Sequence, residues 1–287
     1  MKHQMLGLFA ETAIHAGAGK SVGVIDLPIQ REATTGWPCV FGSAVKGALR
    51  AKAESTDNGS WITEVFGPDT RNASDHAGAL MVGDARLLLL PIRSLTTHFK
   101  WVCSPAVLQR MLADARRAGL PDLPEVSLPE LGAEEALQAA ADELVYLEEY
   151  RFNAKSHDLS SLITVLARFS DQPDFAAQLQ KQLMVVNDNI FAHLASHATP
   201  VAPHIAIDNK SKTVKDGALW YEETLPAQTL LYTVLAANRS RKVGGENAEQ
   251  MMAHTLSLFP QEAPYVQLGG NETVGMGWCR VTRVGGV

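Results

Sequence analysis

The sequence predicts an α+β fold with a ferredoxin-like (RRM-like) core, a helical insertion and a long β-hairpin. Hydrophobic periodicity in the first third of the chain gives a strand, a helix and a strand region, and the same order returns near the C-terminus. Strand, helix and strand, repeated once, is the split βαβ order. We therefore expect residues 1–118 and 225–287 to form the core, residues 119–200 a mainly helical insertion, and residues 201–224 the hairpin.

The N-terminal elements follow from periodicity and helix-start signals. Residues 42–53 are expected to form a helix, because Ser43 suits its cap while Val45 and Leu49 fall on one face. Pro105 suits the first turn of a second helix, which runs to about residue 118. The strands expected in this part are 5–14, 79–90 with an interruption at Gly83-Asp84, and 99–103.

The sequence predicts helices in the middle of the chain, and strands around one helix near its C-terminus. Residues 133–183 are expected to be mostly helical, because apolar residues recur there near helical spacing, and 119–132 is their linker. Short alternating runs on either side of a basic, glycine-containing loop predict the hairpin. The last expected elements are a strand at 229–236, a helix at 248–258 and a strand at 277–284.

Composition and charge limit the classes of protein. The formal net charge of −6, taken alone, argues against binding of nucleic acid. Charge is segregated along the chain, however, since residues 209–215 and 238–242 are basic while acidic residues gather at 134–149, so a basic groove can coexist with a negative total. The longest apolar run, residues 87–92, is too short for a bilayer, and the N-terminus shows no signal-type stretch. The three cysteines have no paired spacing, which argues against structural zinc. We expect a cytoplasmic protein with no membrane partner.

The tract from Ala16 to Ser21 ends in Gly-Lys-Ser and invites comparison with a phosphate-binding loop. That motif requires a glycine five places before its Gly-Lys-Ser, where this chain has Ile14. The residues that follow do not predict a helix start, so no helix N-terminus would face a phosphate. Nucleoside-triphosphate hydrolysis is therefore not expected.

Several motifs occur in an order that resembles a known family. Together they resemble the RAMP superfamily of CRISPR proteins, and within it the fourth-subunit family of the Cmr complex, the Cas-seven-like backbone proteins of type III-B systems. The glycine-rich last stretch is the loop typical of RAMP proteins. The stretches that carry the resemblance are 15–32, 42–50, 78–86 with 91–94, 101–105, 213–226 and 268–277.

The resemblance implies a single RAMP-type domain over residues 1–287 that assembles head to tail on CRISPR guide RNA, together with other Cmr subunits. Such a chain would cleave complementary target RNA, and its hairpin would be a thumb that splays a base pair of the duplex. Besides His15, the RNA-binding residues that the resemblance implies are Lys20, Arg31, Lys46, Arg50, Lys210, Lys212, Gly269, Gly270, Asn271, Thr273, Gly275 and Gly277.

The resemblance also places catalysis at Asp26, which matches the cleavage aspartate of the family. A carboxylate there would accept the 2′-hydroxyl proton or hold a divalent metal ion, Mg or Mn, and the sequence does not choose between these roles. His15 and Glu222 are expected as helpers, with His15 either a proton donor or a phosphate ligand. Alternation puts Glu222 and Glu223 on opposite faces of a strand, so at most one is expected to point at the site.

Two alternatives stay open at this point. The first is an RNA-binding backbone subunit of the same kind of complex that does not cleave RNA. The second, from another class, is a small-molecule enzyme with a glycine-rich pocket, which would be a monomer or closed oligomer that binds no RNA. Asp26 distinguishes the first alternative from the nuclease, because a purely structural subunit has no need for this carboxylate.

Overall fold

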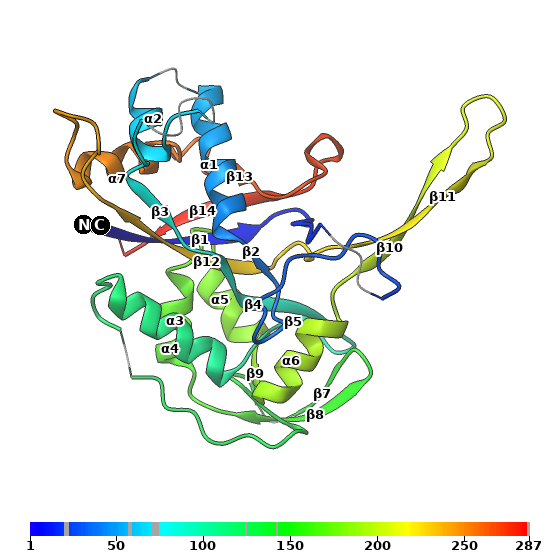
Figure 1. Cartoon of the computed structure of the whole chain (residues 1–287). Helices are drawn as coiled ribbons and strands as arrows, with labels where there is room; N and C mark the ends of the chain where they lie inside the picture. Colours follow the sequence, from blue (N-terminus) through cyan, green and yellow to red (C-terminus); the bar gives the residue numbers. More distant parts are fainter. Residues whose placement is uncertain (20–22, 57–58, 70–74, 124, 142, 286–287) are drawn as a thin grey trace.

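The computed structural model describes residues 1–19, 23–56, 59–69, 75–123, 125–141 and 143–285. A central β-sheet has helices on both sides, and a hairpin projects from one end of the molecule (Figure 1). One continuous sheet follows the strand order β13-β14-β1-β12-β4-β5-β9-β6-β8-β7. The predicted α+β class is confirmed. A sheet of this size exceeds a four-stranded ferredoxin-like sheet, so the ferredoxin-like description and the division into core, insertion and hairpin stay predictions.

The first part of the sheet is built from strands near both ends of the sequence. Here β1 lies between β12 and β14 and pairs antiparallel with both, while β12 pairs antiparallel with β4 on its other side. Their inward-facing residues are fully buried apolar side chains such as Leu8 and Leu231. The strands of this part are β1 (Lys2–Ala10), β2 (Cys39–Val40), β3 (Leu80–Val82), β4 (Ala85–Ser94), β12 (Leu230–Ala237), β13 (Tyr265–Gln267) and β14 (Trp278–Val284).

Three helices cover one side of this part: α1 (Gly42–Thr56), α2 (Trp61–Phe66) and α7 (Ala248–Ser257) (Figure 1). The predicted helices at 42–53 and 248–258 are thereby confirmed. A capping box starts α7, since the Asn247 side chain accepts from backbone amides of the first turn and Gln250 accepts from the Asn247 amide. The three cysteines, Cys39, Cys103 and Cys279, are free and buried.

The second part of the sheet corrects one prediction. The described residues of 133–156 are not helical, and they contain β6 (Glu135–Gln138), β7 (Glu143–Leu147) and β8 (Tyr150–Ser156). Burial along β7 alternates, with Val145 and Leu147 inside and their neighbours outside, which is the period of a strand. The remaining elements are β5 (His98–Cys103), β9 (Leu183–Val186), α3 (Pro105–Arg117), α4 (Ser160–Ala167), α5 (Phe175–Gln182) and α6 (Asp188–His197).

The outcome for the insertion is therefore mixed. The helix expected from Pro105 is present as α3, and the described residues of 119–132 lie outside helices and strands, as expected of a linker. The second half of the insertion contains α4, α5 and α6. The first half packs as strands onto β9 and β4 and extends the sheet. A mainly helical insertion over 119–200 is thus wrong for its first half.

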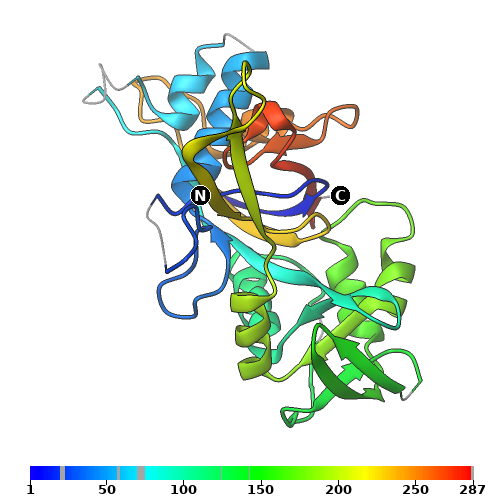
Figure 2. The same ribbon diagram turned by 90° about the vertical axis from the view of Figure 1, so that its right-hand side faces the viewer.

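The predicted hairpin is confirmed and forms a sheet of its own. It consists of β10 (Val201–Ile207) and β11 (Val214–Glu223), paired antiparallel with Val201 opposite Glu223. It projects away from the helices and the large sheet in Figure 1, and toward the viewer in Figure 2. At its tip Asp208 Oδ1 accepts from the backbone amides of Lys210 and Ser211, both at 2.9 Å, which closes the turn.

Gly7 in β1 tests how tightly the segment after α4 packs against the sheet. A Cβ on Gly7 would overlap the carbonyl oxygen of Phe169, which lies against the sheet. We expect Gly7→Ala to lower the free energy of unfolding by about 2–3 kcal/mol, because overpacking forces the backbone apart. Urea denaturation measures this change.

Gly47→Ala is the matched control, because a Cβ at Gly47 on α1 meets nothing within 4 Å. It should raise the free energy of unfolding by about 0.5–1 kcal/mol, since glycine weakens a helix interior. Equal stability of the Gly7 variant and the wild type would contradict the packing described here.

Candidate functional site

Three segments that are distant in sequence meet at the base of the hairpin: the loop 11–31, the end of β11, and the glycine-rich loop 268–277 (Figures 1 and 2). Backbone hydrogen bonds hold them together. Ile14 and Leu225 exchange amide-to-carbonyl bonds of 2.9 Å, and the Gly270 amide donates to the His15 carbonyl at 2.8 Å. The loops therefore have fixed positions relative to the hairpin.

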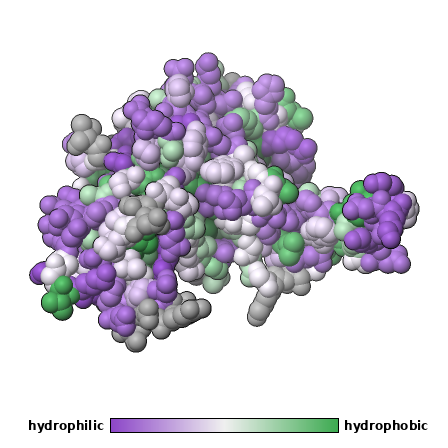
Figure 3. Space-filling model, turned by 90° about the horizontal axis from the view of Figure 1, so that it is seen from above, coloured by the Kyte–Doolittle hydropathy of each residue, from purple (hydrophilic) through white to green (hydrophobic). Residues whose placement is uncertain are grey.

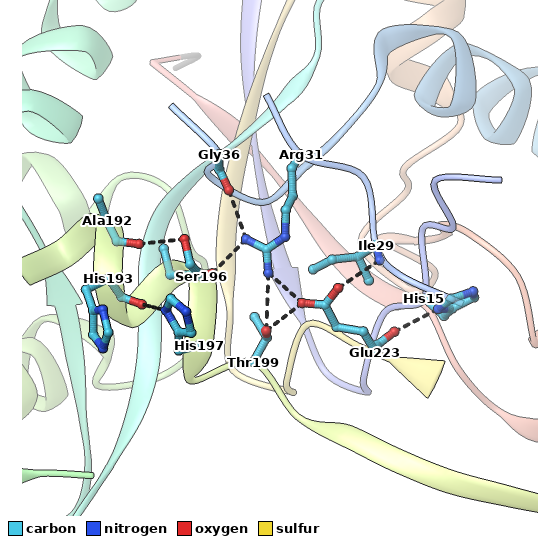
Figure 4. A network of polar contacts seen from close by, with 11 residues as sticks. His15, Ile29, Arg31, Gly36, Ala192, His193, Ser196, His197, Thr199 and Glu223 are labelled. Carbon is cyan, nitrogen blue, oxygen red and sulfur yellow. Dashed lines mark hydrogen bonds and ion pairs between the residues drawn. The ribbon is translucent and has the colours of Figure 1, made fainter. Parts of the chain in front are cut away.

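A buried carboxylate, Glu223, ties the hairpin base to the rest of the chain (Figure 4). Its Oε1 accepts from Arg31 at 2.5 Å and from the Thr199 hydroxyl at 2.6 Å, and its Oε2 accepts from the Ile29 amide at 3.0 Å. Only 3% of the Glu223 side chain is exposed. A buried charge is stable only when it is paired and hydrogen-bonded, and Glu223 meets both conditions.

Arg31 was expected to bind RNA, but its guanidinium has partners inside the chain. Besides Glu223 it donates to the carbonyls of Gly36 at 2.9 Å and Ala195 at 2.8 Å. These contacts join the loop after residue 28 to α6. The geometry thus favours a structural role for Arg31, and an RNA contact by this residue stays a prediction.

His15 lies on the other side of Glu223. Its Nδ1 is 2.8 Å from the Glu223 backbone carbonyl oxygen, which can only accept, so Nδ1 carries a proton and donates it to this bond. A Cβ on Gly17 would lie 3.1 Å from the His15 Nε2, which shows how closely the loop passes the ring. His15 is 8% exposed. It is therefore a fixed imidazole whose Nε2 has no hydrogen bond to the residues that the structure describes.

Asp26 lies against the free edge of β11. Its Oδ2 accepts from the Tyr221 amide at 2.8 Å, while the Leu27 amide donates to the Tyr221 carbonyl and the Glu223 amide donates to the Leu27 carbonyl, both at 3.0 Å. The carboxylate is exposed, and Oδ1 accepts no hydrogen bond from the residues that the structure describes. One oxygen is thus anchored and the other is available to a ligand.

Glu222 and Glu223 point to opposite sides of the strand, as alternation predicted. Glu222 is 4% exposed, and its Oε1 accepts from the Asn271 side-chain amide at 2.6 Å. Asn271 has a left-handed φ of 60° at the start of the turn η2 (Glu272–Val274). Glu222 therefore faces the glycine-rich loop, while Glu223 faces Arg31. The sequence did not reveal the central role of Glu223.

A groove runs between α1 and the glycine-rich loop. Its walls are small residues and backbone, and at Gly269 a Cβ would overlap the His15 carbonyl oxygen, with φ at 86°. Only glycine fits that position without strain. The residues that line the groove are Ala16, Gly17, Gln30, Ala44, Gly47, Ala48, Ala51, Gln267, Gly269 and Gly270.

The two basic residues predicted on one face of α1 differ in their surroundings. The Arg50 guanidinium bonds Glu54 at 2.7 Å and Asp69 at 2.8 Å, so it has partners within the chain. Lys46, half-buried and outside the groove lining, has neither a hydrogen bond nor an ion pair among the described residues. Lys46 is thus the free cation of this helix face.

Most of the remaining predicted residues lie apart from this groove, and Gly277 has a role in the backbone structure of the loop. Lys210 and Lys212 are exposed at the hairpin tip, Thr273 and Gly275 are exposed around η2, and Lys20 lies outside the described residues. The Gly277 amide donates to the Ala13 carbonyl at 2.8 Å. A Cβ there would overlap the Leu268 carbonyl oxygen, so Gly277 shapes the loop.

The donor set near Asp26 decides whether the chain itself can build a metal site. Over the described ranges, no three His, Cys, Asp or Glu residues group so that they could hold a metal ion. Asp26 alone could contribute one free carboxylate oxygen. A metal ion at this position would need ligands besides Asp26, such as water or a bound molecule.

Comparison with known proteins places the chain in a family. The model of the RAMP superfamily matches residues 9–280. The chain belongs to the RAMP superfamily. It is 34% identical over 291 residues to the CRISPR system Cmr endoribonuclease Cmr4 of Pyrococcus furiosus, covering 98% of this chain and 96% of that protein. It is 26% identical to the CRISPR system CMR subunit Cmr4 of Saccharolobus solfataricus, covering 93% and 92%.

Solved structures agree with this membership. A crystal structure of oligomeric Cmr4 from Pyrococcus furiosus superposes with a TM-score of 0.76 at 28% identity, covering 100% of this chain and 99% of that one. A cryo-EM structure of the type III-B Cmr-beta complex bound to cognate target RNA contains the same fold, with a TM-score of 0.77 at 23% identity. The resemblance to RAMP proteins of the Cmr4 family is confirmed. In the described part of this RAMP protein, no helix is long and apolar enough to cross a membrane.

The Glu223 network yields a prediction about stability. We expect Glu223→Ala to lower the free energy of unfolding by about 3 kcal/mol, because breaking a buried pair leaves Arg31 without its charged partner. Urea denaturation of the purified chain measures the change.

Glu249→Ala is the control, because its ion pair with Lys2 spans 3.9 Å and Glu249 is 78% exposed. This substitution should change stability by less than about 0.5 kcal/mol. Similar stabilities of the two variants would show that Glu223 does not hold the hairpin base.

Proposed function

We propose that this chain is the backbone subunit of a type III-B CRISPR effector complex, which binds guide RNA as a head-to-tail filament and cleaves complementary target RNA. The identity of 34% over nearly the whole length of a protein named an endoribonuclease supports the activity. The similarity to an oligomeric Cmr4 supports self-assembly. The observation that carries the proposal is the Asp26 carboxylate, held by the Tyr221 amide with its second oxygen open.

RNA binding would use the groove between α1 and the glycine-rich loop. Its walls of alanine and glycine let a phosphate come close to backbone amides, which bind anions without any side chain. Lys46 does not line the groove, and it would add an unpaired positive charge from another face of α1. In this arrangement the glycine-rich loop is a binding element, and its glycines are required by geometry at Gly269 and Gly277.

Cleavage would use the 2′-hydroxyl of the target RNA as the nucleophile. Asp26 would accept the hydroxyl proton, the 2′-oxygen would bond to the adjacent phosphorus, and the bond from phosphorus to the 5′-oxygen would break. The products are a 2′,3′-cyclic phosphate and a 5′-hydroxyl, whose proton comes from water or from a protonated His15. Most of the acceleration would come from holding the hydroxyl in line with the scissile phosphate.

A divalent ion, Mg²⁺ or Mn²⁺, remains part of the proposal. Asp26 would supply one oxygen ligand and RNA phosphates would supply others, which is how Mg²⁺ commonly binds at nucleotide sites. When bound, the ion would stabilise negative charge that develops on the phosphate. The chain's own part is to hold the Asp26 carboxylate against β11.

We further propose that β14, β1, β12 and β4 form a ferredoxin-like core, with residues 1–287 as one domain in the cytoplasm. Neighbouring strands in this set are antiparallel. The helix α1 connects β1 to the β3–β4 region, and α7 connects β12 to the C-terminal strands. This is the split βαβ order that many RNA-binding folds share.

Asp26→Asn tests the catalytic assignment, because asparagine keeps an oxygen for the Tyr221 amide and loses the basic carboxylate. In a complex reconstituted with guide RNA and partner subunits, we expect cleavage of labelled complementary RNA to slow by about 100-fold or more. A chelator should abolish wild-type cleavage, and added Mg²⁺ or Mn²⁺ should restore it.

The control is Asp216→Asn, which changes an exposed aspartate of the same strand, β11. It should cleave like the wild type, and sizing should show equal assembly for all variants. Unchanged cleavage by the Asp26 variant, with normal assembly, would leave a guide-holding subunit without this catalytic group.

Gly47→Gln tests the groove. The substitution places a larger side chain among the groove walls at a position with free space, so the fold should tolerate it. We expect the affinity for labelled single-stranded RNA, measured by fluorescence anisotropy at fixed salt, to fall about tenfold, or about 1.4 kcal/mol.

The matched control is Ala253→Gln on the exposed side of α7, outside the groove lining. This variant should bind RNA like the wild type. Equal affinities of the Gly47 and Ala253 variants would place the RNA elsewhere on the surface.

A further inference from the structure

The hairpin carries an aromatic pair that the reaction described above does not use. His204 and Trp220 lie directly opposite each other on β10 and β11. Their rings are stacked, with centroids 5.6 Å apart and an interplanar angle of 15°. Both side chains are partly exposed on a two-stranded sheet that projects from the molecule (Figure 1). A large aromatic surface is thus presented to solvent outside the core.

The pair lies next to the proposed cleavage site. Trp220 directly precedes Tyr221, whose amide holds Asp26. Two residues further along the same face is Glu222, which is bonded to Asn271 of the glycine-rich loop. The aromatic pair therefore lies on the hairpin next to the residues of β11 that contact Asp26 and the glycine-rich loop.

The opposite face of the hairpin has a different character. It presents Ile205, Leu219 and Tyr221, which are 48%, 54% and 41% exposed. Figure 3 shows the hairpin as a projection with hydrophobic patches along it and a largely hydrophilic end. The two faces are therefore not equivalent, and only the His204–Trp220 face combines a stacked aromatic pair with a position beside Asp26.

We propose that Trp220, supported from behind by His204, is a platform on which an unpaired RNA base stacks, so that the adjoining phosphate lies at Asp26. Every base has a π-face, so stacking on an indole tolerates any target sequence. A stacked base fixes its ribose, and cleavage by the 2′-hydroxyl depends on that orientation. Trp220 is then a substrate-positioning residue. The inference rests on the proposed function, because it assumes bound target RNA.

The experiment uses the complex reconstituted with guide RNA and partner subunits, and target RNAs that each carry a single 2-aminopurine. Fluorescence is recorded in the Asp26→Asn background so that the RNA stays whole. When Trp220 is present, the fluorescence of a 2-aminopurine beside the cut position should be quenched by stacking. In the Trp220→Ala variant this fluorescence should increase. In the complex that retains Asp26, the same substitution should lower the single-turnover cleavage rate about tenfold.

Two matched variants separate stacking from hairpin stability. Trp220→Phe keeps an aromatic ring and should retain most of the quenching and of the rate. Leu219→Ala removes the neighbouring side chain on the other face and should behave like the wild type. Normal assembly in sizing is required of every variant.

The outcomes distinguish this inference from the function on which it rests. Wild-type cleavage together with unchanged quenching in Trp220→Ala would overturn the platform and leave the nuclease intact. Equal defects in Trp220→Phe and Trp220→Ala would also overturn it, because stacking should survive the first change. A complex that binds RNA but never cuts it would overturn the cleavage proposal, while loss of quenching in Trp220→Ala would still support the platform.

Discussion

The arrangement of the site depends on the buried carboxylate of Glu223. Through its two oxygens it joins Arg31, Thr199 and the Ile29 amide, so one side chain connects the end of β11 to the start of β10 and to the loop 29–31. A two-stranded hairpin is marginally stable by itself. Movement of the hairpin base would break the contacts of Glu223 and leave a buried carboxylate unpaired, which is strongly unfavourable. These contacts therefore hold the base rigid. The direction of the whole projection follows from that constraint.

A rigid hairpin base also places the chemical groups. Within the described part of the chain Asp26 has no buried partner of its own, and its position comes from the edge of β11, through the Tyr221 amide. The glycine-rich loop is attached to the neighbouring residue, since Asn271 bonds Glu222. The adjacent residues 221 to 223 thus organise the carboxylate, the loop and the core contact. This is a compact way to align groups that are nearly 250 positions apart in sequence.

The sequence predicts those elements whose signals are local. The helix at Gly42–Thr56 and the hairpin follow from spacing and alternation, and both are present. The sequence predicts helix at the strand Glu143–Leu147, because its apolar residues satisfy both the helical and the strand period over so short a stretch. The Glu223 network was not predicted, because its partners are non-local. Charge on Arg31 or Arg50 suggests RNA, but spacing cannot reveal a carboxylate that folding brings beside them.

An acidic chain is compatible with RNA binding if recognition does not depend on net charge. The net charge is −6, and Lys46 of α1, which has neither a hydrogen bond nor an ion pair among the described residues, is not one of the residues that line the groove. Backbone amides exposed by small residues would supply most of the contacts, with little release of counterions for each copy. The affinity of one copy would then be modest, and strong binding would come from many copies on one guide RNA. A subunit built in this way gains by assembly and has little tendency to hold RNA alone.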